Sequence, residues 1–127
     1  MLDIRGVVFM RRDMEIIRNI LIETGNGKST VSLPRNESSE LLKYQYEIAE
    51  EKCLIRYKAY HSKDRFTFSE VKLTSLGNDL LDEIENDTVW GNTKDFIKTK
   101  GLEIGKVSLS LLKDIAIQQG KKQFGLE

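Results

Sequence analysis

Apolar residues near the start of the chain recur at helical spacing. This pattern predicts a helix over residues 12–24. Its inward positions are Met14, Ile17 and Leu21, with Ile16 and Ile20 beside them. The run Gly25–Asn26–Gly27 predicts the end of the helix, because glycine adopts the positive φ of a helix C-terminus at little cost. Residues 30–33 then alternate between polar and apolar side chains, which predicts a short strand that ends at Pro34.

A β-hairpin is predicted in the middle of the chain. Residues 56–60 and 65–73 form its two strands, and the polar turn 61–64 joins them. The apolar positions of the second strand are Phe66, Phe68, Val71 and Leu73. Their spacing changes by one residue after Phe68, which predicts a β-bulge near Ser69 and Glu70.

Two helices flank this hairpin. The first begins at an N-cap of Asn36 or Ser38 and runs to about Lys52, with one broad apolar side. The second covers about residues 75–86, and Thr74 is its N-cap. The side chains expected to face inward from this second helix are Leu76, Leu80, Leu81 and Ile84.

The C-terminal part of the chain predicts two more helices. A short one carries Val89, Trp90, Phe96 and Ile97 and ends near Gly101, and the last runs over about residues 108–119. The apolar residues of the last helix are Leu109, Leu111, Leu112, Ile115, Ala116 and Ile117. They occupy more than one face of the helix, which one small core does not easily cover. We therefore expect a homodimer that forms through the C-terminal helices.

The order of these elements predicts an α+β, winged-helix-like domain with a two-stranded wing and a C-terminal helical extension. We expect residues 1–127 to form a single domain, with a winged-helix core over 10–88 and C-terminal helices over 89–127. Residues 1–9 look separable, as an added strand, the product of an upstream start or a cloning remnant. A complete helix-turn-helix has two helices before the wing, whereas residues 35–53 hold only one. The part that would read DNA is therefore expected to be reduced.

Composition narrows the function classes. The chain is 39% apolar and 31% charged, an ordinary mixture for a folded domain. Its 20 basic and 20 acidic side chains cancel, so net charge does not draw it to nucleic acid or membrane. Cys53 and His61 are the only residues of their kinds, which excludes an intramolecular disulfide and a Cys/His zinc site. No apolar run reaches the roughly 20 residues of a membrane span. We expect a cytoplasmic protein with no membrane contact.

Three segments resemble a known family. They are Arg11–Leu21, Leu73–Asp82 and Asp87–Trp90. Together they resemble the bacterial and phage family called domain of unknown function 2513 (DUF2513), over about Met10 to Leu126. Asn78 stands where that family often has histidine, and Cys53 where it often has glycine or another small residue. The resemblance implies a winged-helix-like fold in a bacterium or prophage, and the family has no assigned active site.

Three features that suggest catalysis or ligand binding have simpler explanations. The segment Gly25–Thr30 follows a helix and has Ile22 where a phosphate loop has its first glycine. The carboxylates Asp79, Asp82, Glu83, Glu85 and Asp87 alternate with apolar residues, as on a solvated helix face. Cys53 precedes Leu54 and Ile55, so we expect a buried structural thiol. We therefore expect no enzyme activity, no cofactor, no metal and no small-molecule substrate.

Basic residues gather on the predicted wing. They are Arg56, Lys58, His61, Lys63 and Arg65, and Arg11, Arg12, Lys28 and Arg35 extend the same side. Such groups can hold double-stranded DNA by its phosphates, while Lys43 and Gln45 on the preceding helix would face the groove. Five glutamates over residues 37–52 oppose this interpretation, because they repel phosphate. A solvated hairpin edge that lysine and arginine protect against aggregation is the structural alternative.

Two functional hypotheses follow. The first is a DNA-binding transcriptional regulator of bacterial or phage origin. The second is a protein-interaction or adaptor module on a degenerate winged-helix scaffold, which uses the acidic helix and the apolar C-terminal helix as contact surfaces and does not bind DNA.

Overall fold

The computed structural model of the protein describes residues 11–126, so the separable segment 1–9 lies outside the described residues. The elements are α1 (Met14–Gly25), β1 (Val31–Pro34), α2 (Glu37–Glu51), β2 (Ile55–Ala59), β3 (Arg65–Leu73), α3 (Ser75–Ile84), α4 (Asp87–Thr99), the short 3-10 helix η1 (Ile104–Lys106) and α5 (Leu109–Gln123). The predicted helices and strands are all present, in the predicted order. Only η1 was not predicted, and α4 and α5 are longer than their apolar patterns indicate.

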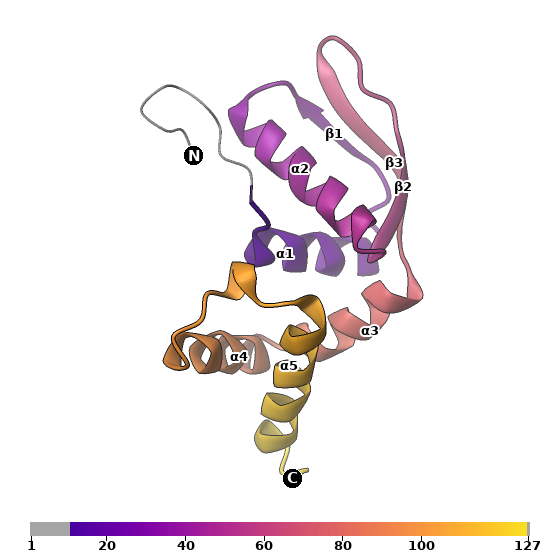
Figure 1. Ribbon diagram of the computed structural model, residues 1–127. Coiled ribbons are helices and arrows are strands. Elements are labelled where there is room, and N and C mark those ends of the chain that lie inside the picture. The colour runs from indigo at the N-terminus through magenta and orange to yellow at the C-terminus, as the bar shows by residue number, and fades with distance from the viewer. Residues whose placement is uncertain (1–10, 127) are drawn as a thin grey trace.

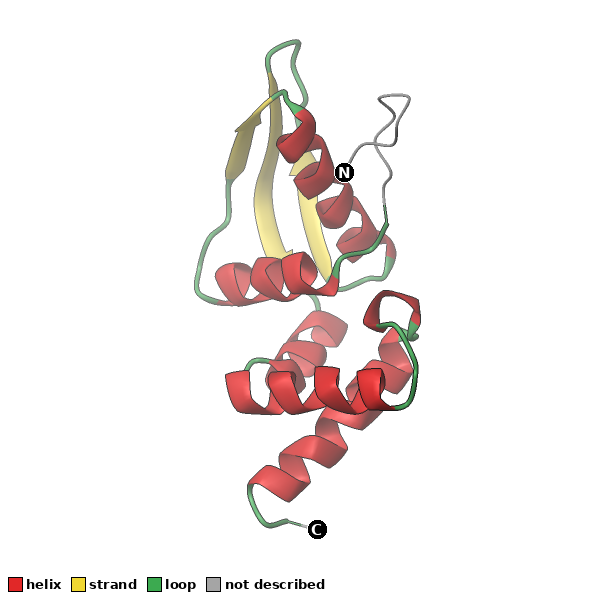
Figure 2. Ribbon diagram, turned by 90° about the vertical axis from the view of Figure 1, so that its left-hand side faces the viewer, coloured by secondary structure: helices red, strands yellow, loops and turns green. Residues whose placement is uncertain are grey.

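The three strands form one antiparallel sheet in the order β1-β3-β2. Helix α2 lies along one face of this sheet, and α1 crosses near its lower end (Figures 1 and 2). Phe68 of β3 is fully buried at the centre of this layer. The ring of Tyr46 from α2 stacks on Phe68 at 4.9 Å, and the ring of Tyr57 from β2 meets it edge-on at 4.6 Å. The fold is therefore a mixed α+β arrangement with its first core between α2 and the sheet.

The predicted bulge in the hairpin is confirmed. Arg56 pairs with Lys72 and Lys58 pairs with Ser69, so two residues of β3 lie opposite Tyr57 alone. One of these two, Glu70, has a φ of 51°. The extra residue restores the inward direction of the apolar side chains after Phe68, which is why their spacing changes along the sequence.

Four helices end in the same capping motif. In α1, α4 and α5, a glycine with positive φ follows the last turn, at Gly27, Gly101 and Gly125. Helix α2 ends in this way at Cys53, whose φ is 61°. There the Leu54 amide donates to the Ala49 carbonyl at 2.8 Å, and the Cys53 amide donates to the Glu50 carbonyl at 2.9 Å.

The Cys53 side chain is exposed, so the prediction of a buried thiol is wrong. The left-handed backbone turns this residue outward, and the apolar neighbours Leu54 and Ile55 enter the core without it. The same conformation explains why a small residue, often glycine, suits this position.

Helix α3 approaches this turn very closely. Thr74 caps α3 as predicted, since its hydroxyl accepts the Gly77 amide at 3.0 Å. A Cβ atom on Gly77 would lie 1.9 Å from the carbonyl oxygen of Leu54, which explains the glycine. Leu76 was predicted to face inward, but it is 56% exposed. That prediction is wrong because α3 turns its Gly77, Leu80, Leu81 and Ile84 face to the interior.

Helices α3, α4 and α5 form the lower half of the molecule (Figure 1). Leu112, Ile115 and Ala116 of α5 are buried against α3 and α4 of the same chain. Leu109 and Ile117 are half-buried, and Leu111 is 45% exposed. The chain thus covers most of the apolar surface of α5 by itself. The homodimer through the C-terminal helices stays a prediction.

A buried arginine joins the two halves. Arg18 of α1 donates from Nε to the Ile84 carbonyl and from Nη2 to the Glu85 carbonyl, both at 2.7 Å. Its Nη2 also forms an ion pair with Asp87 at 2.7 Å, and its guanidinium lies 5.5 Å from the Trp90 ring centre. The Trp90 indole N–H in turn donates to Glu15 of α1 at 3.1 Å. Two of the segments that carry the family resemblance therefore contact each other.

Candidate nucleic-acid interface

The face of the sheet opposite α2 carries polar side chains and has no helix over it within residues 11–126 (Figure 2). We call it the outer sheet face. Its basic residues are Arg56 and Lys58 of β2 and Arg65 and Lys72 of β3, and Ser32, Thr67 and Ser69 lie among them. Strand alternation places these residues on one face, because Phe66, Phe68 and Val71 point to the core. The structure therefore brings together three of the five predicted wing residues.

Lys72 is the member of this face that we did not predict. It is the cross-strand partner of Arg56, so two cations lie directly opposite each other. Like charges at such positions destabilise a sheet. Within residues 11–126 neither forms an ion pair with a carboxylate. The alternation along β3 could have revealed Lys72, but its pairing with Arg56 depends on the bulge.

The other two cations of the outer sheet face are held by neighbours. Lys58 forms an ion pair with Glu70 at 3.0 Å, and hydrogen bonding and charge from Glu70 raise the pKa of Lys58. Both side chains are largely exposed, so this pair contributes little to stability. Arg65 donates from Nε to the Ser32 hydroxyl at 2.6 Å and from Nη2 to the Ser32 carbonyl at 2.9 Å. These bonds hold the Arg65 guanidinium against β1, whereas Lys63 at the wing tip is exposed.

Helix α2 offers little to a DNA groove. Gln45, which we predicted to face the groove, is fully buried. Its side chain accepts the Asp13 amide at 2.8 Å and donates to the Arg11 carbonyl at 2.7 Å. The prediction is wrong because the amide group of Gln45 fastens the start of α1 to α2. Lys43 forms an ion pair with Glu47 at 3.2 Å, on the same helix.

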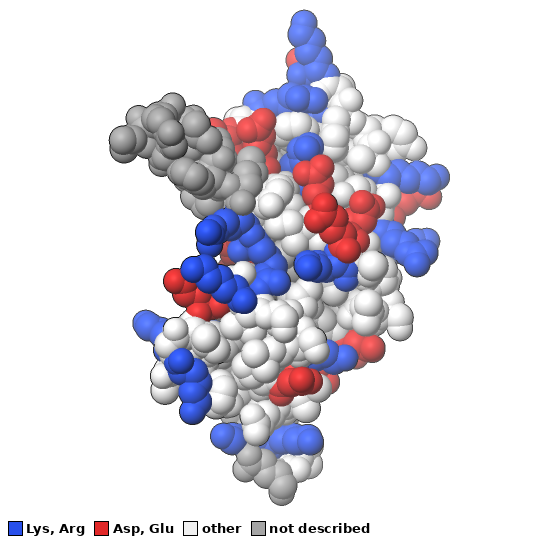
Figure 3. Space-filling model, in the orientation of Figure 1, with Lys and Arg blue, Asp and Glu red and all other residues white. Residues whose placement is uncertain are grey.

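The acids of α2 lie over the inner side of the hairpin. Burial, together with the charges of Glu50, Glu47 and Glu51, raises the pKa of Tyr57. Burial, with a smaller effect of Glu23, raises the pKa of Tyr46 to about 12. Figure 3 shows acidic side chains over α2, with basic side chains at the wing tip and along the edge formed by β2 and β3. Acidic side chains thus outnumber basic ones on α2, and basic ones outnumber acidic ones on the hairpin.

The predicted basic residues at the start of the chain differ in role. Arg11 is exposed. Arg12 is half-buried and donates to the carbonyls of Gly105, at 3.0 Å, and of Val107. Burial lowers the pKa of Arg12. This side chain connects the start of α1 to η1, so it is occupied by the fold and is not presented to a partner.

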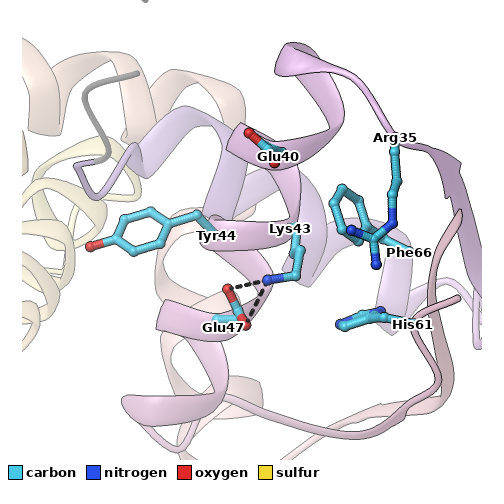
Figure 4. A pocket seen from close by; sticks show the side chains of 7 residues that line it. All are labelled: Arg35, Glu40, Lys43, Tyr44, Glu47, His61 and Phe66. Carbon is cyan, nitrogen blue, oxygen red and sulfur yellow. Dashed lines mark hydrogen bonds and ion pairs between the residues drawn. The ribbon is translucent and has the colours of Figure 1, made fainter. Parts of the chain in front are cut away.

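His61 lies on the α2 side of the wing and not on the outer sheet face. Its Nδ1 accepts the Thr67 amide at 3.2 Å, and its ring meets Phe66 and Phe68 edge-on, at 5.4 and 5.1 Å. His61, Arg35 and Lys43 line one cleft between α2 and the wing (Figure 4). The volume of this cleft is about 440 Å³. The predicted wing residues are therefore divided between two faces of the sheet.

The segment Gly25–Thr30, which was compared with a phosphate loop, connects α1 to β1. Lys28, in the glycine-containing turn, pairs with Glu23 of α1 at 2.8 Å, and the turn connects a helix to a strand. Within the described part of the chain, no three metal-ligating side chains come together. Nor does any helix there have the length and apolar character to cross a membrane.

Comparisons with known proteins agree with the resemblance of the three segments. A family model described as "Hypothetical protein (DUF2513)" matches residues 11–103. An uncharacterised protein of Haemophilus influenzae is 33% identical over 112 residues, which cover 84% of this chain and 92% of that protein. No solved structure matches. The matched region contains the wing, the outer sheet face and the Arg18–Asp87 contact. The chain therefore belongs to the DUF2513 family.

Proposed function

We propose that this protein binds nucleic acid through the outer sheet face and the wing tip, on a scaffold related to the winged helix. The observation that carries the proposal is the cross-strand pair of Arg56 and Lys72. Two like charges opposite each other cost stability, and a polyanion bound across both strands would offset this cost. Lys58, Arg65 and Lys63 would extend the same surface toward the wing tip.

The element order supports a winged-helix relationship. A helix, a strand, a helix and a two-stranded wing follow in turn, and the first strand pairs with the second strand of the wing. One helix of the helix-turn-helix is missing between β1 and β2. Since α2 is acidic and Gln45 is buried, the contacts proposed here go to phosphates and not to base edges. The protein would then bind DNA with low sequence selectivity, as part of bacterial or phage regulation.

The test is fluorescence anisotropy of a mixed-sequence DNA duplex, titrated from low to physiological salt. The double variant Arg56→Ala/Lys72→Ala should bind more weakly and reduce the salt slope by about two released counterions. Its stability should not fall, because the substitution removes a repulsion. The variant Lys121→Ala/Lys122→Ala removes the same charge at the far end of α5 and serves as the control. Equal affinity of the two double variants would contradict the proposal.

A protein-interaction module is the second candidate. The observations that favour it are the acidic surface of α2 and the exposed Leu76 and Leu111 on α3 and α5. In this case duplex DNA would not bind even at low salt, and a self-complex or a complex with another protein would form. Sedimentation equilibrium of the chain and of Leu111→Glu addresses the homodimer. If the unchanged chain and Leu111→Glu both had the mass of a monomer at high micromolar concentration, the homodimer would be excluded as the interaction.

A further inference from the structure

The cleft between α2 and the wing lies on the opposite side of the sheet from the outer sheet face. Its lining residues are Arg35, Glu40, Lys43, Tyr44, Glu47, His61 and Phe66. They come from three separate parts of the chain: the turn before α2, α2 itself and the wing. In Figure 4, Arg35, Lys43 and His61 surround the Phe66 ring, whereas Tyr44 points away. A cleft of about 440 Å³ has the size of a small-molecule site.

Two cations share one aromatic ring in this cleft. The Arg35 guanidinium lies 4.5 Å from the ring centre of Phe66, and the Lys43 ammonium lies 5.4 Å from it. Arg35 is held in place by its Nε, which donates to the Ser62 carbonyl at 2.7 Å. Its two terminal nitrogens make no hydrogen bond within residues 11–126, so the bidentate edge of the guanidinium remains available.

The histidine presents a third donor. Its Nδ1 accepts the Thr67 amide, so the neutral ring carries its proton on Nε2. Burial, Lys43 and Arg35 lower the pKa of His61, whereas Glu47 acts in the opposite direction. The positive charges of Arg35 and Lys43 therefore both act on the His61 imidazole and disfavour its protonated form.

Carboxylates limit the charge of the cleft. Lys43 contacts both oxygens of Glu47 at 3.2 and 3.3 Å, distances that are long for a charge-assisted hydrogen bond. An incoming anion can replace Glu47 as the partner of Lys43, since Glu47 is 41% exposed and can turn to solvent. Glu40 also lines the cleft, which favours a ligand whose charge is confined to one group.

We propose that this cleft binds a single phosphate-type oxyanion, held by the guanidinium of Arg35, the ammonium of Lys43 and Nε2–H of His61. Three donors from different directions suit a tetrahedral oxyanion, and a guanidinium binds phosphate in a bidentate manner. The group would come from a small phosphate ester or from a phosphate of a nucleic-acid backbone. Binding would link α2 to the wing tip. This site does not depend on the outer sheet face, so it goes beyond the proposed function.

His61 is the only histidine of the chain, so its imidazole C–H signals in an NMR spectrum report on the cleft without ambiguity. Titration with inorganic phosphate at constant ionic strength should give a saturable shift, and chloride should not. Arg35→Gln should weaken phosphate binding by about tenfold or more, as loss of a charge-assisted contact does. Lys43→Gln provides a second variant if Arg35→Gln does not fold. The variant Arg56→Ala/Lys72→Ala is the control and should respond as the unchanged chain does.

The two sources of phosphate are separated by titrating glycerol 3-phosphate and duplex DNA in this control variant. A saturable His61 shift with the ester alone assigns the cleft to a small molecule, and a shift with DNA assigns it to a backbone phosphate. No saturable shift with any phosphate, or equal shifts in Arg35→Gln and the unchanged chain, would overturn the proposal. If Arg56→Ala/Lys72→Ala lost DNA affinity but no phosphate shifted the His61 signals, the phosphate site in the cleft would be refuted. The proposed function would then remain supported.

Discussion

Cys53 occupies a backbone conformation that glycine occupies at the ends of α1, α4 and α5. A left-handed conformation costs a non-glycine residue about 1–2 kcal/mol. Glycine avoids this cost but loses about 0.5–1 kcal/mol through the extra freedom of the unfolded chain. The exposed thiol makes no compensating core contact. The glycines that follow α1, α4 and α5 at the corresponding position agree with a net advantage of glycine there.

We therefore expect Cys53→Gly to raise the free energy of unfolding by roughly 0.5–1 kcal/mol. Urea denaturation followed by circular dichroism measures this change. Cys53→Ala removes the thiol but keeps the strained conformation, so its stability should stay close to that of the unchanged chain. If the alanine variant gained as much as the glycine variant, the thiol and not the backbone would be the cause.

At the scale of elements, the contact between α3 and the end of α2 depends on the absence of one methyl group. A Cβ at position 77 would lie 1.9 Å from the Leu54 carbonyl oxygen, far inside contact distance. That oxygen also accepts the Thr74 amide at 3.0 Å, so it is fixed by the N-terminus of α3. The two elements would have to separate to accommodate alanine.

Gly77→Ala is expected to lower the free energy of unfolding by about 1–3 kcal/mol, the usual cost of overpacking. Gly91 is the matched control, because it lies within α4 and a Cβ there would have no atom within 4 Å. Gly91→Ala should raise stability by up to about 1 kcal/mol through helix propensity. Thermal unfolding of the two variants in parallel measures both changes. If both midpoint temperatures moved in the same direction, the close contact at Gly77 would not be the cause.

For the whole molecule, Arg18 is a buried polar connection between the sheet-bearing half and the C-terminal helices, beside the contacts of Arg12 with Gly105 and of Trp90 with Glu15. Its side chain is buried, while the side chain of its ion-pair partner Asp87 is 95% exposed. The stabilisation thus resides mainly in the hydrogen bonds to the carbonyls of Ile84 and Glu85 and not in the pair with Asp87.

Arg18→Met keeps an unbranched chain as far as the position of Nε but leaves both carbonyls without their donor. We expect a loss of about 2–3 kcal/mol in the free energy of unfolding. Asp87→Asn should cost much less. Urea unfolding monitored by Trp90 fluorescence and by circular dichroism checks both values. Equal losses in the two variants would show that the ion pair, rather than the carbonyl bonds, holds the halves together.

Local features of the sequence were sufficient to predict the elements of this molecule. Apolar spacing identified α1, α2, α3, α4 and α5. Thr74 was predicted as the cap of α3, and Asn36 was one of the two candidate caps of α2. The bulge at Glu70 was also predictable, because a change in alternation is a property of one strand. Each of these features depends on residues within a few positions of one another, where backbone geometry alone relates them.

Predictions of side-chain environment succeeded less often. Gln45 has a polar side chain on a helix, and nothing local indicates that it bonds to the backbone of Arg11 and Asp13. Arg12 was assigned to a basic surface, yet carbonyls more than 90 residues away hold it. Leu76 fits the apolar spacing of α3, but only the position of Gly77 against Leu54 determines which face is covered.

The sequence by itself determined the family, the α+β class, the order of helices and strands, and the basic character of the wing. These follow from composition, short-range periodicity and recognisable segments. Only the tertiary structure decided that Lys72 lies opposite Arg56, that Arg18 joins the two halves, and that Arg35, Lys43 and His61 meet in one cleft. Such contacts depend on strand register and on how helices pack across the sheet. These long-range relations are set by the free energy of the whole fold and cannot be inferred from the spacing of residues along the chain.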